Sequence, residues 1–167
     1  MGKLDKALYY ARKQVEHCGV YVWGGQGEKL RKLTTLKLAQ MESSAENAAR
    51  VERFIYTHLK QFDKNTKCFD CSGLVYWVYK QYGYDLQPGA RNQWSTLDKS
   101  VKKADLLPGD LVFFSRNGRA SGIFHVGLYI GDGQFVHAAN SKKGVIVTDL
   151  DDAWYANRYL GAKRVIE

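Results

Sequence analysis

Apolar residues recur every three or four positions in three stretches of the chain, which predicts three amphipathic helices. The first helix spans residues 4–17 and the second spans 44–62, with Ser43 and Glu46 at the spacing of a capping box. The third spans 74–82 and ends at Gly83. The apolar positions are, in order, Leu4, Leu8, Ala11 and Val15; Ala48, Val51, Ile55, Leu59 and Phe62; and Leu74, Val75, Val78, Tyr79 and Tyr82.

The second half of the chain changes to short apolar runs separated by turn residues, a pattern typical of β-strands. After a short predicted helix over residues 91–97, the expected strands are 110–115, 123–130, 134–139, 144–148 and 160–166. Helices first and strands afterwards favour an α+β domain with an antiparallel sheet of about five strands.

Two of these runs predict a hairpin that brings two histidines together. A three-residue loop over 131–133 pairs Ile130 with Gln134, and His125 and His137 then fall on one face as diagonal neighbours. We expect the opposite face to pack and the histidine face to hold chemistry. One histidine can take a proton from a nucleophile while the second fixes the first ring's tautomer. The opposite face carries Phe124, Val126, Leu128, Ile130 and Val136.

Cys71 is the candidate nucleophile, because it lies at or just before the start of the 74–82 helix, where Asp70 or Ser72 can cap. The unpaired N–H groups of a helix start carry partial positive charge, which lowers the pKa of a thiol, and the thiolate is the attacking species in cysteine catalysis. The alternative for Cys71 is a buried structural cysteine.

The chain contains two more cysteines, Cys18 and Cys68. A Cys18–Cys68 disulfide cannot be argued from the sequence. Cys68 and Cys71 have the spacing of a redox pair, but no thioredoxin-like βαβ pattern accompanies them. No zinc-ligand spacing occurs, and a metal site of Cys71, His125 and His137 is a minor alternative. We therefore expect neither a metal nor a cofactor.

Composition and charge describe one domain, with 167 residues of which 45% are hydrophobic and 25% charged. The net charge of +8 suits an anionic partner, and no basic run interleaved with aromatics matches a nucleic-acid motif, so we expect no nucleic acid. No apolar stretch reaches the length of about 18 residues of a membrane span. The first six residues lack the apolar core of a signal peptide.

Several blocks of this sequence resemble the signature of the NlpC/P60 cell-wall cysteine peptidases. Three carry the candidate chemistry: residues 70–75 (DCSGLV), 125–131 (HVGLYIG) and 135–138 (FVHA). Three more agree in order: 21–25 (YVWGG), 107–114 (LPGDLVFF) and 154–164. The resemblance covers residues 4–25 and 68–166. It implies a papain-like α+β fold and one catalytic domain over 1–167.

The resemblance also implies roles for individual residues. Cys71 attacks an amide carbonyl, His125 generates the thiolate and His137 orients His125. Tyr21, with the Cys71 backbone N–H, stabilises the oxyanion or binds the substrate.

Asp70 and Ser72 match positions that recognise the substrate in some members of the family, although Asp70 could equally be only a helix cap. The implied substrate is the stem peptide of bacterial peptidoglycan. The implied bond follows D-γ-glutamate and precedes a diamino acid.

The sequence departs from the family pattern between the double glycine and the cysteine block, where residues 26–67 take the place of a short loop. Its flanks are active-site blocks, so we hypothesise a helical flap beside the substrate groove. A packed surface decoration is the alternative.

Two other functions remain open. One is an amidase or acyltransferase on the same scaffold, and the other is a non-catalytic wall-binding module. We expect a monomer that acts on the cell wall. Without a signal peptide in this chain, it is released as phage or mobile-element lysins are, works in cytoplasmic recycling, or is a domain cut from a secreted protein.

Overall fold

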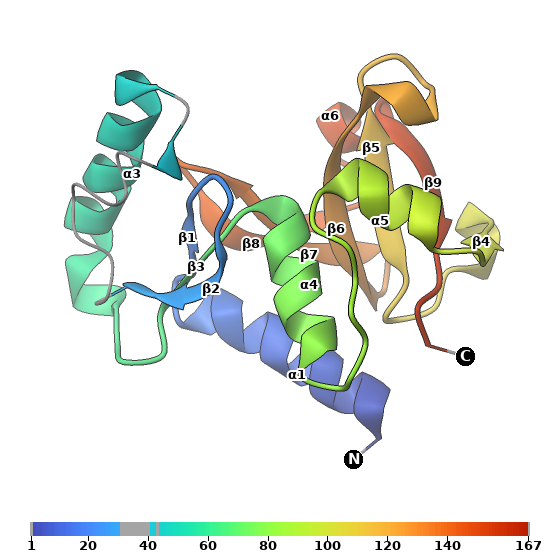
Figure 1. Cartoon of the computed structure of the whole chain (residues 1–167), viewed down its shortest axis with the longest axis horizontal. Coiled ribbons are helices and arrows are strands. Elements are labelled where there is room, and N and C mark those ends of the chain that lie inside the picture. The colour runs from blue at the N-terminus through green and yellow to red at the C-terminus, as the bar shows by residue number, and fades with distance from the viewer. Residues whose placement is uncertain (1, 31–40, 43, 167) are drawn as a thin grey trace.

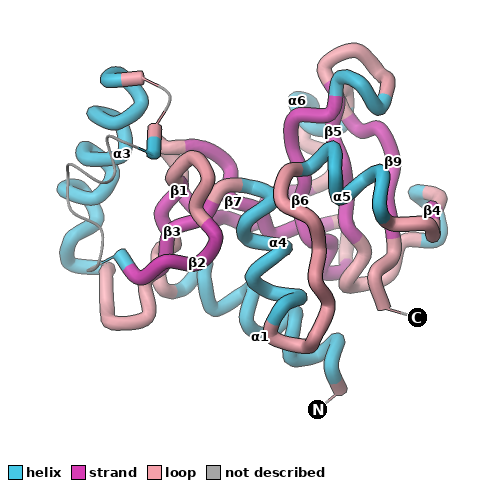
Figure 2. The backbone as a smooth tube through the Cα atoms, in the orientation of Figure 1, coloured by secondary structure: helices cyan, strands magenta, loops and turns pink. Residues whose placement is uncertain are grey.

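A six-stranded antiparallel sheet forms the centre of the computed structural model, which describes residues 2–30, 41–42 and 44–166 (Figures 1 and 2). Its strand order is β4-β9-β5-β6-β7-β8. The strands are β4 (Ser100–Val101), β5 (Leu111–Ser115), β6 (Ile123–Gly131), β7 (Gln134–Asn140), β8 (Gly144–Asp149) and β9 (Tyr159–Lys163). The five predicted strands are confirmed, and the short edge strand β4 is additional.

The strands bury both faces of this sheet, as β5 illustrates. All five of its residues are buried, and its side chains alternate between two apolar clusters. Leu111 and Phe113 belong to the main core, whereas Val112 and Phe114 belong to a second cluster on the other face. An unbroken apolar run is therefore a strand here because both of its faces pack.

Helices α1 (Lys3–Glu16) and α4 (Cys71–Lys80) cover the face of the main core, as Figure 1 shows. Ala7 and Ala11 of α1 and Leu74 and Val78 of α4 are fully buried there. Both helices agree with the predicted spans within a few residues. The predicted helix over 91–97 is α5 (Ala90–Thr96), and a short helix α6 (Ala153–Ala156) precedes β9.

A second, three-stranded sheet was not predicted. Its order is β1-β3-β2, from β1 (Val20–Tyr21), β2 (Gln26–Lys29) and β3 (Lys67–Phe69). The helix α3 (Ala45–His58) packs on it through an apolar cluster. That cluster comprises Val20, Val22, Val51, Phe54 and Cys68.

The predicted helix over 44–62 is confirmed as α3, followed by a 3₁₀ turn over Leu59–Gln61. Ser44 caps α3 by accepting a hydrogen bond from the Asn47 backbone N–H at 3.2 Å. The capping box with Ser43, and most of residues 28–40, lie outside the described residues.

The β6–β7 hairpin keeps the predicted register with a different turn. Gly131 pairs with Gln134 across the two-residue turn Asp132–Gly133, where both residues have positive φ. Ile130 is an extra residue in β6, so Tyr129 pairs with Phe135, as the three-residue loop had predicted. The predicted three-residue loop is wrong. The shorter turn and the extra residue Ile130 offset each other, so the side chains of both strands lie on the predicted faces.

The histidine face of the hairpin is packed as well as the opposite face, for which packing was predicted. Phe135 and Phe114 form the second apolar cluster there, and Phe124 packs with them rather than on the main core. Within the described residues, no helix is both long enough and apolar enough to cross a membrane.

Candidate active site

The start of α4 is held by Asp70, the helix N-cap. Its Oδ1 accepts a hydrogen bond from the Gly73 backbone N–H at 2.6 Å, and its Oδ2 accepts one from the Gly24 backbone N–H at 3.0 Å. A Cβ on Gly73 would lie 1.8 Å from the Gly25 carbonyl oxygen, so the double-glycine turn packs directly on the helix. Cys71 is consequently fixed as the first residue of α4.

Ser72 supports the same arrangement. Its hydroxyl donates to Asp70 Oδ1 at 3.0 Å and accepts from the Gly89 backbone N–H at 3.2 Å, and the residue is buried. The hydroxyl therefore already has two partners within the fold, and the Asp70 carboxylate has three.

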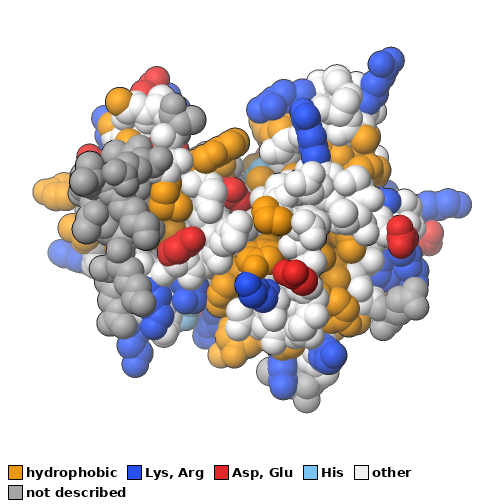
Figure 3. All heavy atoms as spheres, in the orientation of Figure 1, with side chains coloured by type: hydrophobic (Ala, Val, Ile, Leu, Met, Phe, Trp, Pro, Cys, Tyr) orange, Lys and Arg blue, Asp and Glu red, His pale blue; other side chains and the backbone are white. Residues whose placement is uncertain are grey.

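Cys71 opens onto a cleft of about 450 Å³. Figure 3 shows the molecule hollowed between the part with α3 and the part with α5. Two cations lie in the cleft: Arg91, whose Nε donates to the Ile123 carbonyl at 3.2 Å, and Arg116, which lies over the Phe124 ring. Further residues around Cys71 are Tyr21, Trp23, Asp70, Ser72 and Phe124.

The described residues of the segment 26–67 reach the rim of this cleft at Glu42. Glu42 Oε1 accepts a hydrogen bond from the Trp23 backbone N–H at 2.8 Å. None of the described residues of this segment lines the cleft, because α3 packs beneath the small sheet. The described part of the segment thus lies beside the cleft without lining it, and the flap hypothesis stays a prediction.

The Cys71 thiol is neutral in the free protein. Burial, followed by the nearby Asp70 carboxylate, raises its pKa to about 12, against the smaller opposite effect of the backbone N–H groups of Val126 and Ser72. The expectation of a lowered pKa is therefore wrong, because desolvation outweighs the helix N-terminus. The contact with the Val126 backbone N–H also places the sulfur beside β6, the strand that carries His125.

The two histidines and one threonine form a chain of hydrogen bonds. His125 Nε2 lies 2.8 Å from His137 Nδ1, and His137 Nε2 lies 2.8 Å from Thr148 Oγ1. The side chains of His125 and His137 are buried, with 6% and 0% exposure, while Thr148 on β8 is half-buried. The predicted pairing of the histidines on one face is confirmed.

Both imidazoles are neutral at pH 7. Burial lowers the pKa of His125 to about 4. Burial also lowers the pKa of His137, with the charges of His125 and Lys143 acting in the same direction. The site at rest is therefore a neutral thiol with two neutral imidazoles.

The ring of Tyr155 on α6 packs against both histidines. Its ring centre lies 5.0 Å from that of His137 and 6.1 Å from that of His125. Sequence reasoning assigned a role neither to Tyr155 nor to Thr148. The register of the strand 144–148 was the available signal for Thr148, which pairs with Phe135 two residues before His137.

Tyr21 faces the same cleft, and burial raises the pKa of its hydroxyl well above the ordinary range. The hydroxyl thus stays a hydrogen-bond donor at every working pH. The three cysteines are free thiols, and no three-residue metal-ligand group occurs within the described ranges.

Relatives of this chain are found among curated proteins. It is 36% identical to the murein DD-endopeptidase MepH of Escherichia coli over 100 residues, which are 59% of this chain and 36% of that protein. It is 34% identical over 102 residues to the gamma-D-glutamyl-L-lysine dipeptidyl-peptidase of Bacillus cereus, covering 59% of this chain and 29% of that protein. The chain thus spans about a third of these relatives.

A solved structure shares the fold over nearly the whole chain. It is that of RipD from Mycobacterium tuberculosis, described as a non-catalytic NlpC/p60 domain protein adapted to peptidoglycan binding. The TM-score is 0.65 at 20% identity, and the match covers 99% of each chain. The NlpC/P60 family itself matches residues 60–164, which hold Cys71, His125, His137 and Thr148. This chain therefore belongs to the NlpC/P60 family.

Proposed function

We propose that this protein is a peptidoglycan hydrolase, a cysteine endopeptidase that cleaves the stem peptides of bacterial cell wall. The observation that carries the proposal is the chain from His125 through His137 to Thr148, in a protein whose Cys71 opens onto a cleft. The family and the names of the relatives support the choice of substrate. We also propose one catalytic domain over 1–167 that carries residues 26–67 as an insertion.

The hydrogen-bond chain supports the tautomer that catalysis needs when Thr148 acts as its acceptor. If Thr148 accepts from His137 Nε2–H, then His137 Nδ1 accepts from His125 Nε2–H. This leaves the lone pair of His125 on Nδ1, the nitrogen free to take the Cys71 proton. Thr148 is thus a positioning residue that acts through His137.

In the reaction, Cys71 Sγ bonds to the carbonyl carbon as its proton passes to His125. The C–N bond then breaks, and the imidazolium gives that proton to the leaving amine. Water hydrolyses the thioester by the reverse proton transfers and frees Cys71. The backbone N–H of Cys71, unpaired at a helix start, and the Tyr21 hydroxyl stabilise the oxyanion.

The bond we propose lies between D-γ-glutamate and a diamino acid. A γ-linked glutamate keeps a free α-carboxylate beside the scissile amide, and Arg91 and Arg116 supply two cations in the cleft. The name of the Bacillus cereus relative specifies this linkage. The Escherichia coli relative is named for a DD bond, which makes DD cleavage the second candidate. Asp70 and Ser72 contribute mainly by holding the helix start.

The test is mass spectrometry of soluble fragments after incubation of purified peptidoglycan with the protein and, in parallel, with Cys71→Ala. We expect the wild type alone to release peptides cut after D-glutamate. Cleavage between the two D-residues of a cross-link would show that the enzyme cuts the DD bond instead. Sugar strands freed from whole stem peptides would identify an amidase instead.

Two results would overturn the proposal itself. Equal cleavage by Cys71→Ala would remove the cysteine from the mechanism. Binding to walls without turnover by the wild type would favour a non-catalytic module, the description that RipD carries.

A further inference from the structure

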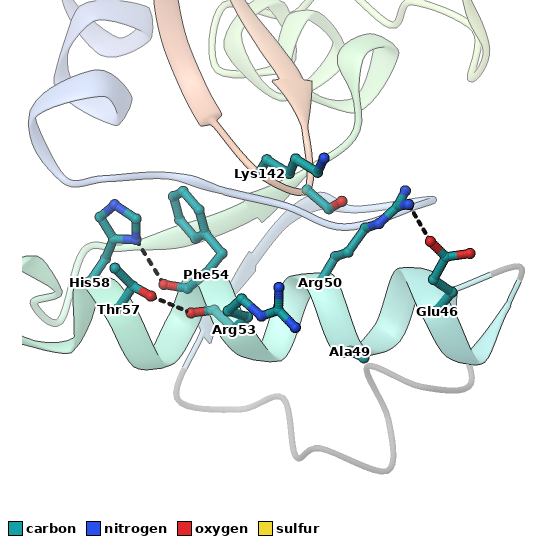
Figure 4. A pocket seen from close by; sticks show the side chains of 9 residues that line it. Glu46, Ala49, Arg50, Arg53, Phe54, Thr57, His58 and Lys142 are labelled. Atoms are coloured by element: carbon teal, nitrogen blue, oxygen red, sulfur yellow. Dashed lines mark hydrogen bonds and ion pairs between the residues drawn. The ribbon is translucent and has the colours of Figure 1, made fainter.

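A second concave site lies away from Cys71, between α3 and the turn that joins β7 to β8 (Figure 4). The groove holds about 490 Å³. Arg50 and Arg53 line it from α3, and Lys142 lines it from the turn, while Phe54 is a nearly buried floor. Cations from segments about 90 positions apart in sequence thus converge on one hollow.

The backbone holds the turn against α3. The Asn140 side-chain oxygen accepts hydrogen bonds from the backbone N–H groups of Lys142 and Lys143 at 3.0 and 3.1 Å. Gly144 has φ +66°, and a Cβ there would lie 2.8 Å from the Phe54 ring. Only glycine allows this approach, so the relative position of Lys142 and α3 is built into the fold.

The groove carries an excess of positive charge. Arg50 is paired with Glu46 on the same helix, and Figure 4 shows the two side chains joined. Among the described residues, the side chains of Arg53 and Lys142 have neither an ion pair nor a hydrogen bond. Three cations and one carboxylate line the groove, so two positive charges are left for a ligand.

We propose that this groove binds the phosphodiester groups of an anionic cell-wall polymer. Two cations on a fixed frame suit successive phosphates along a flexible chain. Single-stranded nucleic acid is less suited, because such sites stack bases on exposed aromatic rings. The one aromatic ring of the floor, Phe54, is 5% exposed and is stacked on His58 with ring centres 4.1 Å apart.

Most of the groove lies outside the residues that the family model matches. α3 lies outside residues 60–164, and only the turn at 141–142 falls inside them. The choice of a wall polymer rests on the proposed function, whereas phosphodiester recognition follows from the groove itself. Bound there, the polymer would hold the enzyme on the wall while the cleft finds stem peptides.

The test measures affinity for a defined poly(glycerol phosphate) by calorimetry, using the full chain with Cys71→Ala so that turnover cannot interfere. Arg53→Gln combined with Lys142→Gln should weaken binding about tenfold or more, because each substitution loses the binding free energy of a contact between a cation and a phosphate. The matched control combines Lys6→Gln with Lys102→Gln, which removes the same charge at exposed positions elsewhere. We expect this control to bind almost as the parent does.

Several results would overturn the proposal. Equal weakening in both double variants would mean that net charge alone attracts the polymer. Displacement by inorganic phosphate at equal phosphate concentration would mean a site for a single phosphate. Tighter binding of single-stranded DNA, with the same dependence on Arg53 and Lys142, would assign the groove to nucleic acid.

Failure of the proposed function has a separate readout. When Cys71 is retained, Arg53→Gln combined with Lys142→Gln should not change the turnover of a soluble stem peptide. Loss of turnover in Cys71→Ala tests the catalytic assignment without reference to the groove. Binding without turnover would therefore uphold the groove and reject the peptidase.

Discussion

Thr148 lies between the buried histidines and the outer surface of the molecule. Its hydroxyl is the last atom of the hydrogen-bond chain, and it lies in a surface hollow with Lys143 and Asp149. A neutral imidazole presents one donor and one acceptor, so the direction of the hydrogen bond at one end of a histidine pair sets the proton positions along both rings. When Thr148 on β8 acts as the acceptor, the proton of His125 lies on Nε2.

Replacing Thr148 by valine should lower kcat/KM about tenfold to a hundredfold, because a buried N–H that loses its acceptor costs about 1–3 kcal/mol and favours the other tautomer. Thr148→Ser keeps the oxygen and is the matched control, for which we expect nearly full activity. Nitrogen NMR of the histidine rings should show the proton of His125 moving from Nε2 in the valine variant. Unchanged tautomers together with lost activity would mean that Thr148 acts only on packing.

The resting state of Cys71 predicts its reactivity. Because the pKa of this thiol is raised to about 12 in the free protein, alkylation by iodoacetamide should be slow at pH 7 and should keep rising beyond pH 9. Peptide mapping separates Cys71 from Cys18 and Cys68. A rate that levels off below pH 7 would instead reveal a thiolate–imidazolium pair before substrate binds.

At the scale of elements, the junction between the double-glycine turn and α4 decides where Cys71 lies. Gly73 sits against the Gly25 carbonyl, and Gly25 in turn packs within 2.9 Å of the Phe69 backbone, measured from a Cβ built on Gly25. The backbones of β3, the turn and α4 therefore meet without side chains between them. Such a contact leaves no flexible atoms to move aside.

Gly73→Ala should destabilise the protein by about 3 kcal/mol or more, since the new methyl group would overlap a backbone oxygen. Gly133→Ala is the control: its φ is also unfavourable for alanine, but nothing lies within 4 Å of the added methyl group, so we expect about 1 kcal/mol. Urea unfolding measures both. Equal losses would mean that the close contact at Gly73 relaxes without difficulty.

Elements with a strong local pattern were predictable, and those made by distant pairing were not. The apolar periodicity of α1, α3 and α4 and the runs of β5–β9 gave their positions within a few residues. The small sheet joins β1 and β2 to β3 across about 40 residues, and two of its strands have too few residues for a pattern. For the same reason Thr148 could not be assigned, because its distance from His137 depends on strand register.

The thiol pKa shows the other limit of sequence reasoning. A helix start at Cys71 can be recognised from local residues, and its effect on charge has a known sign. The degree of burial depends on how α4, β6 and α6 assemble, and here burial decides the result. Sequence thus locates the candidate chemistry, while packing sets its protonation state.

At the scale of the whole molecule, a basic surface encloses a site whose histidines carry no charge. The net charge is +8, and the groove beside α3 gathers three of the cations. The histidines are kept neutral by the second apolar cluster and by Tyr155. The basic groove beside α3 and the neutral histidine pair therefore lie in separate parts of the molecule.

Burial of neutral histidines should make the protein sensitive to mild acid. His125 has a pKa of about 4 when folded and about 6.5 when unfolded, so between these values the unfolded chain binds more protons. The free energy of unfolding should fall as pH drops from 6.5 towards 4, by on the order of 3 kcal/mol for His125, and His137 acts in the same direction. Asp70, whose pKa is raised by burial, opposes this loss.

Urea unfolding at a series of pH values measures this dependence, and the double variant His125→Gln with His137→Gln isolates its source. Glutamine stays neutral throughout, so the variant should lose most of the slope between pH 6.5 and 4 even though its stability at pH 7 is lower. Comparing slopes rather than midpoints removes the cost of the substitutions themselves. If the slope were the same in both proteins, the acid sensitivity would come from surface charge, and the histidines would be open to water.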